Sequence, residues 1–188
     1  MRRSLPTAVF VGRRGVGKGL TLNRLFALGL DTDPLRECRT GPSAHRLRAA
    51  NGRSWLVVDL PGIAADTDYD AHHRRWLPHA DVLVWITHAA VRTYRQDQLF
   101  WRDHARFVAA RTRLVLAVGR FDARLTGLPG SAAEPAGADL IRRTLSEAAA
   151  GVIPSAWTTA GRVRVVPYSI EAGWNLDRLH REIFEEGR

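Results

Sequence analysis

The sequence predicts an α/β fold: a six-stranded, mostly parallel sheet with helices on both faces. Short apolar runs of strand length alternate along the chain with segments whose apolar residues recur at helical spacing. Two adjacent strand patterns are joined at Asn51-Gly52, a sequence typical of hairpin turns, which predicts one antiparallel edge strand. The 188 residues suit a single domain, 1–188, and are enough to bury roughly 70% of the unfolded surface.

The first part of the chain carries a strand, a helix and the hairpin. Residues 7–11 are an unbroken apolar run, typical of a buried strand, and lead into a glycine-rich loop. Leucines and a phenylalanine at helical spacing predict a helix over 20–28. The Asp, Thr, Pro and Gly residues of 29–43 predict a loop. The arms of the hairpin are 44–49 and 54–58.

The middle of the chain repeats the alternation. A polar segment, 62–81, contains one helical piece near 69–76. The run Val-Leu-Val-Trp-Ile at 82–86 is a buried strand, and 94–110 is a helix because its large apolar residues recur at helical spacing. The run Leu-Val-Leu-Ala-Val at 114–118 is the next strand.

The last part of the chain completes the sheet. Glycine and proline at 127–135 predict a loop, 140–150 a helix, 163–166 the last strand and 176–185 a closing helix. Strands that alternate with helices in this way form parallel sheets.

Composition limits the location and partners of the protein. The single cysteine, Cys38, excludes an internal disulfide and fits a reducing compartment. No apolar run approaches the ~20 residues of a membrane-spanning helix, and the basic start lacks the apolar stretch of a signal peptide. We therefore expect a cytoplasmic protein. The net charge of +9 fits an RNA or ribosome partner, but scattered arginines fit an arginine-rich genomic composition as well.

A phosphate-binding loop is predicted at 12–19, which reads Gly-Arg-Arg-Gly-Val-Gly-Lys-Gly. This is the pattern G-x-x-x-x-G-K without its final Ser or Thr, and it lies between an expected strand and an expected helix. Lys18 is the only lysine among the 28 Lys and Arg residues of the chain. The slim ammonium group of lysine reaches the phosphates of a closely wrapped nucleotide, where a planar guanidinium is too wide.

Three further motifs follow expected strands in order. Asp59-Leu60-Pro61-Gly62 follows the third strand, where a carboxylate can hold a magnesium-bound water and a glycine N–H can bond a γ-phosphate. The segment 119–122 (Gly-Arg-Phe-Asp) follows the fifth strand, and 169–173 (Ser-Ile-Glu-Ala-Gly) follows the sixth. Their ends meet at the carboxyl edge of the sheet, where we expect the ligand to bind.

With these motifs in this order, the chain resembles the small GTPase superfamily, and specifically the Era-like bacterial GTPases of the P-loop NTPase class. The stretch from 81 to 100 resembles the YfjP/YkfA group, in which an apolar run with a Trp precedes a helix with an Asp-x-x-Phe stretch. The resemblance covers 7–184 and implies a G domain that binds GTP or GDP with Mg²⁺.

The resemblance also implies residue roles. Lys18 would neutralise the β- and γ-phosphates, Thr40 would ligate Mg²⁺ and Asp59 would hold the metal through water. Asp122 would bond guanine. The implied catalytic residues are Lys18, Thr40 and Gly62, and the implied metal ligands are Thr40 and Asp59. The implied nucleotide-binding residues are Gly12, Gly15, Val16, Gly17, Lys18, Gly19, Asp59, Gly62, Arg120, Asp122, Ser169 and Ile170.

Three positions depart from the family pattern. Gly19 replaces the Ser or Thr that ligates Mg²⁺, so we expect a weakly held metal and slow hydrolysis at most. Thr21 would face another side of the helix and would not substitute for it. Gly119 and Arg120 replace the Asn and Lys of N-K-x-D, which weakens the predicted guanine contacts.

Other functions fit parts of the same pattern. Gly19 and Gly119, which lack the site side chains of the family, favour a pseudo-GTPase that binds an unknown protein partner and carries out no chemistry. A basic RNA- or ribosome-associated factor is compatible with either function. A P-loop kinase or ATPase is disfavoured because the motifs recur in GTPase order. His72, His73, His79 and His88 lack the spacing of a metal site and are expected at the surface.

Overall fold

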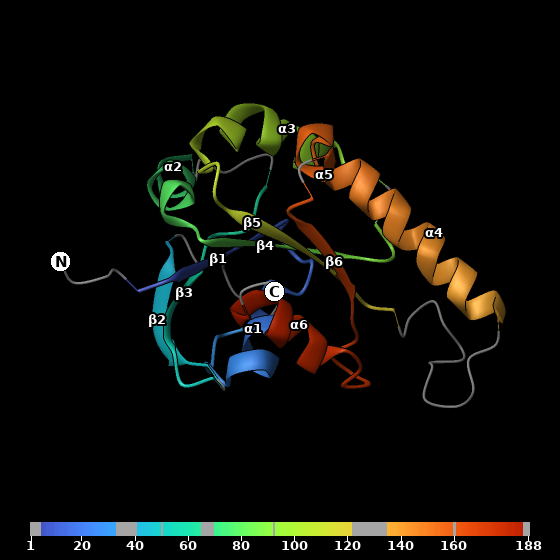
Figure 1. Ribbon diagram of the computed structural model, residues 1–188, viewed down its shortest axis with the longest axis horizontal. Helices are drawn as coiled ribbons and strands as arrows, with labels where there is room; N and C mark the ends of the chain where they lie inside the picture. The colour runs from blue at the N-terminus through green and yellow to red at the C-terminus, as the bar shows by residue number, and fades with distance from the viewer. Residues whose placement is uncertain are drawn as a thin grey trace.

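The computed structural model describes residues 5–32, 41–49, 51–64, 70–91, 93–121, 135–159 and 161–185. They form one six-stranded sheet in the order β2-β3-β1-β4-β5-β6 (Figure 1). Only β2 runs antiparallel to its neighbour, so the predicted sheet and its antiparallel edge strand are confirmed. The strands are β1 (Thr7–Gly12), β2 (Ser43–Arg48), β3 (Ser54–Asp59), β4 (Val82–His88), β5 (Arg113–Gly119) and β6 (Val163–Pro167).

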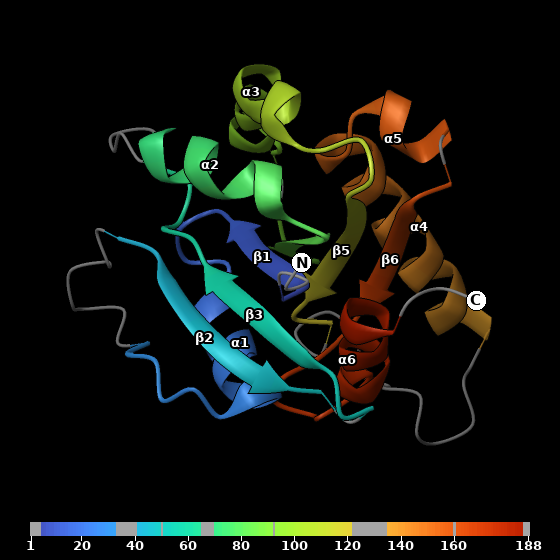
Figure 2. The same cartoon turned by 60° about the vertical axis from the view of Figure 1, so that its left-hand side comes forward.

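Helices cover both faces of the sheet, as predicted (Figures 1 and 2). One face carries α1 (Lys18–Phe26) and α6 (Leu176–Phe184). The opposite face carries α2 (Asp70–Trp76), α3 (Arg95–His104), α4 (Pro135–Val152) and α5 (Ser155–Thr159), with single 3₁₀ turns at Leu77–His79 and Ala105–Phe107. Within the described ranges, no helix has both the length and the apolar character needed to cross a membrane.

Two apolar clusters lie on the two faces of the sheet, and β1 shows how the sequence builds both. All six residues of β1 are buried. Successive side chains of a strand point to opposite faces, so Val9 and Val11 join the cluster under α2, α3 and α4. Ala8 and Phe10 join the cluster under α1 and α6. This double burial explains why the strand reads as a continuous apolar run.

Helix boundaries differ more from the predictions than strand boundaries do. Helix α4 begins at Pro135, before the apolar spacing that predicted a start at 140, because proline is well tolerated in the first turn of a helix. Helix α3 ends at His104, and a 3₁₀ turn and a loop replace the predicted helix to 110. Helix α5 was not predicted, because its short length leaves no apolar periodicity to detect.

The packing of α4 against the start of α3 gives a stability prediction. A Cβ atom added at Gly151 would lie 2.0 Å from a ring carbon of Tyr94. We expect Gly151→Ala to reduce the free energy of unfolding by about 1–3 kcal/mol, because the ring must leave its packed position. Chemical denaturation measures this effect. In a Tyr94→Ala background the same substitution should become neutral or stabilising, since alanine is the better helix former. Equal losses in both backgrounds would contradict the steric explanation.

Candidate functional site

The phosphate-binding loop leaves the sheet at the carboxyl end of β1, between β3 and β4. A side chain at Gly12 would lie 2.5 Å from the backbone oxygen of Ile86 on β4, so this exit admits only glycine. Gly15 and Gly17 have φ angles of 80° and 93°, in the left-handed region that glycine adopts without strain. Helix α1 then begins at Lys18. The strand–loop–helix context predicted for the motif is therefore present.

The ammonium group of Lys18 forms an ion pair with the carboxylate of Asp59, at the carboxyl end of β3. Both side chains are shielded from water, with exposed fractions of 11% and 8%. The cation predicted to bind phosphate and the carboxylate predicted to hold the metal are thus in direct contact, and their charges neutralise each other.

Backbone hydrogen bonds attach the loop to the segment after Asp59. The Ile63 N–H donates to the Gly12 carbonyl at 3.0 Å, and the Arg14 N–H donates to the Ile63 carbonyl at 3.0 Å. Gly62 lies so close that a Cβ atom there would be 3.0 Å from the Arg14 Cα atom. The loop and the Asp-Leu-Pro-Gly motif therefore form one connected backbone unit.

One methyl group of a neighbouring segment lies close to Gly19. A Cβ atom at Gly19 would lie 3.1 Å from the methyl group of Thr32. Asn23 fixes this segment, because its side-chain amide exchanges two hydrogen bonds of 2.7 Å with the backbone of Leu30. The position that would carry a metal-binding hydroxyl instead packs against Thr32.

Thr21 does not replace the missing hydroxyl, as its helical position predicted. Its side chain is fully buried, and its hydroxyl donates to the Gly17 carbonyl at 2.9 Å. The Tyr168 hydroxyl, 2.7 Å away, then donates to the Thr21 oxygen. Tyr168 directly follows β6, so this chain of hydrogen bonds connects the last strand to Gly17 of the phosphate-binding loop.

Tyr168, which no sequence pattern singled out, also explains why position 119 is a glycine. A Cβ atom at Gly119 would lie 3.0 Å from the Tyr168 ring and hydroxyl, so the ring occupies the space that an asparagine side chain there would need. Burial raises the pKa of Tyr168 to about 12. The phenol is therefore a neutral donor at ordinary pH. No local sequence pattern signals this contact between β5, β6 and α1.

The predicted base-binding residues lie near the ends of β5 and β6. Arg120 is exposed and has a φ angle of 57°, which is unusual for a residue with a side chain. Ser169 is fully buried, and its hydroxyl accepts a hydrogen bond of 3.1 Å from the Ala172 N–H, while Ile170 packs at the rim of the cluster under α1 and α6. Asp122 and Thr40 lie outside the described residues.

Of the predicted metal ligands, Asp59 is the one that can be placed. A carboxylate suits Mg²⁺, but Gly19 offers no ligand and the adjacent Thr32 presents its methyl group. The described residues contain no group of three or more His, Cys, Asp or Glu side chains able to hold a metal. Among the described residues of this site, Asp59 is therefore the ligand for a magnesium ion, and phosphate, water and residues outside the described ranges would have to supply the others.

One histidine prediction is wrong. His73 is buried, with an exposed fraction of 4%, and packs edge-on against the Phe100 ring at 4.9 Å between centroids. Its place on the inner face of the short helix α2 explains the burial. The surrounding sequence shows no alternation long enough to reveal that face.

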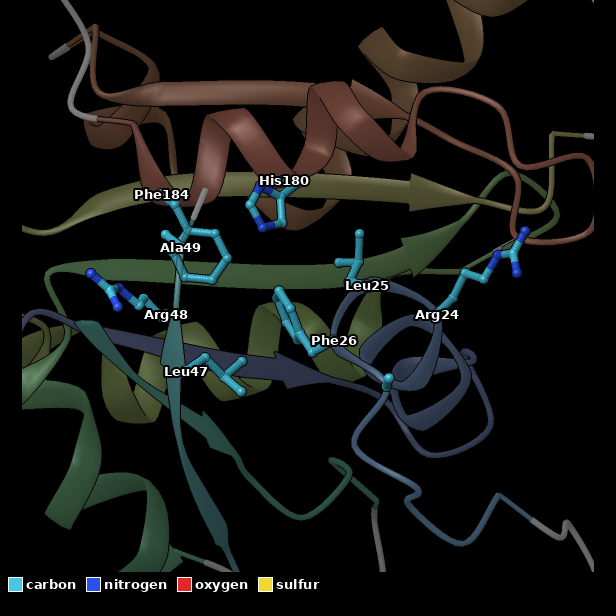
Figure 3. A pocket seen from close by; sticks show the side chains of 9 residues that line it. Arg24, Leu25, Phe26, Leu47, Arg48, Ala49, His180 and Phe184 are labelled. Atoms are coloured by element: carbon cyan, nitrogen blue, oxygen red, sulfur yellow. The ribbon is translucent and has the colours of Figure 1, made fainter. Parts of the chain in front are cut away.

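A cavity of about 370 Å³ lies apart from this site (Figure 3). It is bounded by the carboxyl-terminal part of α1, the end of β2 and two residues of α6, His180 and Phe184. Because α1 begins at the phosphate loop, its opposite end lies toward the other edge of the sheet. The cavity is therefore separate from the predicted ligand site.

Solved structures of GTPases share this fold. Era in complex with MgGDPNP and nucleotides 1506–1542 of 16S ribosomal RNA matches with a TM-score of 0.66 at 18% identity, over 98% of this chain and 58% of that one. An Aquifex aeolicus Era variant bound to GDP·AlF4⁻ matches with a TM-score of 0.68 at 19% identity, over the same shares of the two chains. A dimerization-deficient variant of Toc33 from Arabidopsis thaliana matches with a TM-score of 0.64 at 17% identity, over 96% of this chain and 83% of that one. The chain therefore has the G-domain fold of the P-loop GTPases.

Two curated relatives are similar in sequence. These are the uncharacterized proteins YkfA and YfjP of Escherichia coli (strain K12), 34% identical over 105 residues and 31% over 103 residues. Each match covers 52% of this chain and 36% of the relative, so this chain corresponds to only part of those proteins. No family model matches the chain.

The shielded Lys18–Asp59 pair predicts different outcomes for single and double substitutions. We expect Lys18→Met to abolish binding of a fluorescent GDP analogue and to cost about 3 kcal/mol of unfolding free energy, because Asp59 loses its counter-charge. Lys18→Met with Asp59→Asn should recover most of the stability but not the binding.

Arg102→Met provides the control, since Arg102 pairs with Asp103 at an exposed site and its loss should leave stability and binding unchanged. A folded Lys18→Met variant that binds nucleotide normally would mean that 12–19 is only a structural turn.

Proposed function

We propose that this protein is a guanine-nucleotide-binding protein of the Era-like type that hydrolyses GTP slowly at most. The observation that carries the proposal is the convergence of Lys18 and Asp59 beside a glycine-rich loop with two left-handed glycines. In this arrangement the loop amides and the Lys18 ammonium bind the phosphates, and a nucleotide draws Lys18 away from Asp59.

Catalysis, where it occurs, rests on positioning and electrostatics rather than on covalent chemistry. Lys18 and the loop amides would stabilise charge on the transferred phosphoryl group, Gly62 would offer its backbone N–H to the γ-phosphate, and Thr40 is proposed as the ligand that completes the metal shell. Magnesium, when bound, supplies further positive charge at the phosphates. Asp59, released from Lys18, would hold it through water.

Base recognition is proposed to rely on Asp122, with Arg120, Ser169 and Ile170 around the base. A carboxylate bonds the two N–H donors on one edge of guanine, and adenine offers a lone pair at the equivalent ring position. Gly119 contributes no side chain to this pocket, and its space is filled by Tyr168. Discrimination between the bases is therefore modest in this proposal.

A pseudo-GTPase that acts as a protein-interaction module is the second candidate. The Lys18–Asp59 ion pair fits this candidate as well as the first, because each charge satisfies the other. Gly19, packed against Thr32, also lacks the hydroxyl that would hold a catalytic metal. This candidate differs from the first in predicting nucleotide binding without turnover, or no binding at all.

An RNA or ribosome partner is a further element of the proposal. One Era structure with the same fold is a complex with 16S ribosomal RNA. The net charge of +9 on this chain suits a polyanionic partner, and a cytoplasmic location would bring the two together.

Base specificity tests the proposed function. We expect fluorescent GDP and GTP analogues to bind more tightly than the ATP analogue by about 1 kcal/mol, the low end for a bidentate base contact. Asp122→Ala should remove that difference while leaving affinity for the ATP analogue unchanged. Titrations followed by fluorescence anisotropy give both numbers. Equal or tighter ATP binding that does not respond to Asp122→Ala would refute the guanine assignment.

Magnesium dependence tests the hypothesis that Gly19 leaves the metal weakly held. Nucleotide affinity of the wild type should change little when EDTA replaces Mg²⁺, and phosphate release should be slow or undetectable. Gly19→Ser restores a metal ligand in the first turn of α1 and should strengthen the magnesium dependence, although Thr32 must move by a few tenths of an ångström.

Gly19→Ala is the matched control, because it makes the same steric demand on Thr32 without a hydroxyl. Rapid, strictly magnesium-dependent hydrolysis by the wild type would show that the missing hydroxyl at Gly19 does not weaken the metal site. A Gly19→Ser variant with magnesium-dependent binding and no turnover would favour the pseudo-GTPase.

A further inference from the structure

We propose that Asp97 of α3 is a positioning residue for the phosphate-binding loop, which it holds through Arg13. The inference rests on the proposed function and adds to it a residue outside every motif of the site. Asp97 lies on the helix that covers the opposite face of the sheet from α1.

Asp97 is a fully buried carboxylate with a defined orientation. Its exposed fraction is 0%, and its Oδ1 atom accepts a hydrogen bond of 3.1 Å from the indole N–H of Trp85. Trp85 belongs to β4, the strand beside the phosphate loop, and stacks on Trp101 of the same helix as Asp97. The carboxylate is thereby held in a rigid aromatic setting.

The second carboxylate oxygen faces the phosphate loop. Oδ2 of Asp97 is buried without a hydrogen-bond partner, and the Nη1 atom of Arg13 lies 3.9 Å from it. The same Nη1 atom donates a hydrogen bond of 2.8 Å to the carbonyl of Thr93, just before α3. The Arg13 side chain is therefore directed toward α3 by one carbonyl and one carboxylate.

Burial makes this pair more than a surface contact. Burial raises the pKa of Asp97, while the Trp85 hydrogen bond and the Arg13 charge act to lower it. A buried carboxylate retains its charge at low cost only with a cation and donors beside it. Arg13 is the cation that lowers the cost of a charge on Asp97.

Arg13 passes this constraint to the loop because its backbone is part of the site. It directly follows Gly12 and forms a parallel bridge with Ile63, in the unit that joins the loop to the Asp-Leu-Pro-Gly motif. Ile63 holds the backbone of Arg13 and Asp97 holds its side chain. Together these two contacts fix the orientation of the first turn of the loop. The Arg13 guanidinium points to α3.

The test compares Asp97→Asn, Arg13→Gln and the double variant. Asparagine can keep the Trp85 hydrogen bond through its oxygen but removes the charge that faces Arg13. We expect each single variant to bind a fluorescent GDP analogue about tenfold more weakly, and the double variant to bind no more weakly than either, as for residues acting as one unit. Arg13→Lys, which keeps the charge, should recover part of the affinity.

Asp103→Asn is the matched control, since it makes the same change on the same helix at an exposed residue paired with Arg102. It should leave the affinity unchanged. The proposal would be overturned if the single variants had a lower melting temperature but bound the GDP analogue with wild-type affinity. It would also be overturned if the losses of affinity in the two single variants added fully in the double variant.

Hydrogen exchange of the ligand-free protein separates this proposal from the proposed function. Amides of 12–19 should exchange at least several-fold faster in Asp97→Asn than in the wild type or in Asp103→Asn. If the wild type binds no nucleotide, the proposed function fails, and this measurement alone decides the role of Asp97. Unchanged exchange in the loop would then overturn that role as well.

Discussion

Two opposite charges, shielded from water, meet where β1 and β3 end side by side in the sheet. The Lys18 ammonium and the Asp59 carboxylate are each acceptable in this place because the other is present. An incoming anion can engage Lys18 only by leaving Asp59 in need of a new cation or of water. In the proposed function, ligand binding at this site is thus an exchange of partners, and its strength depends on how well the released Asp59 carboxylate is satisfied afterwards.

The loop around this pair is supported from both faces of the sheet. On one face, Asp97 and Thr93 fix Arg13 at the start of the loop. On the other face, Tyr168 and Thr21 lead to the carbonyl of Gly17 at its end. Each support comes from an element that is itself packed into one of the two apolar clusters. The one apolar side chain of the loop, Val16, is buried in the cluster under α1 and α6, and the rest of the loop depends on the packing of both layers.

The strands and the phosphate loop could be predicted because their signals are local. An apolar run such as 7–11, the turn at Asn51-Gly52 and the pattern of 12–19 each lie within a few residues of sequence. The supports of the loop could not be predicted in the same way. Tyr168 meets Gly119 and Thr21, and Asp97 meets Arg13, only because the strand order brings distant segments together. The predicted roles of Thr40 and Asp122 rest on the family resemblance alone.

The shielding of Lys18 also has a chemical consequence. Lys18 is the only side-chain amine in the 188 residues, and every other long cation is an arginine, which does not acylate under the conditions that modify lysine. Acylation requires the neutral, accessible form of the amine, whereas Lys18 is 11% exposed and paired with a carboxylate. Any reagent or enzyme that acylates lysine side chains in this chain therefore has one target, and access to it is controlled by the site itself.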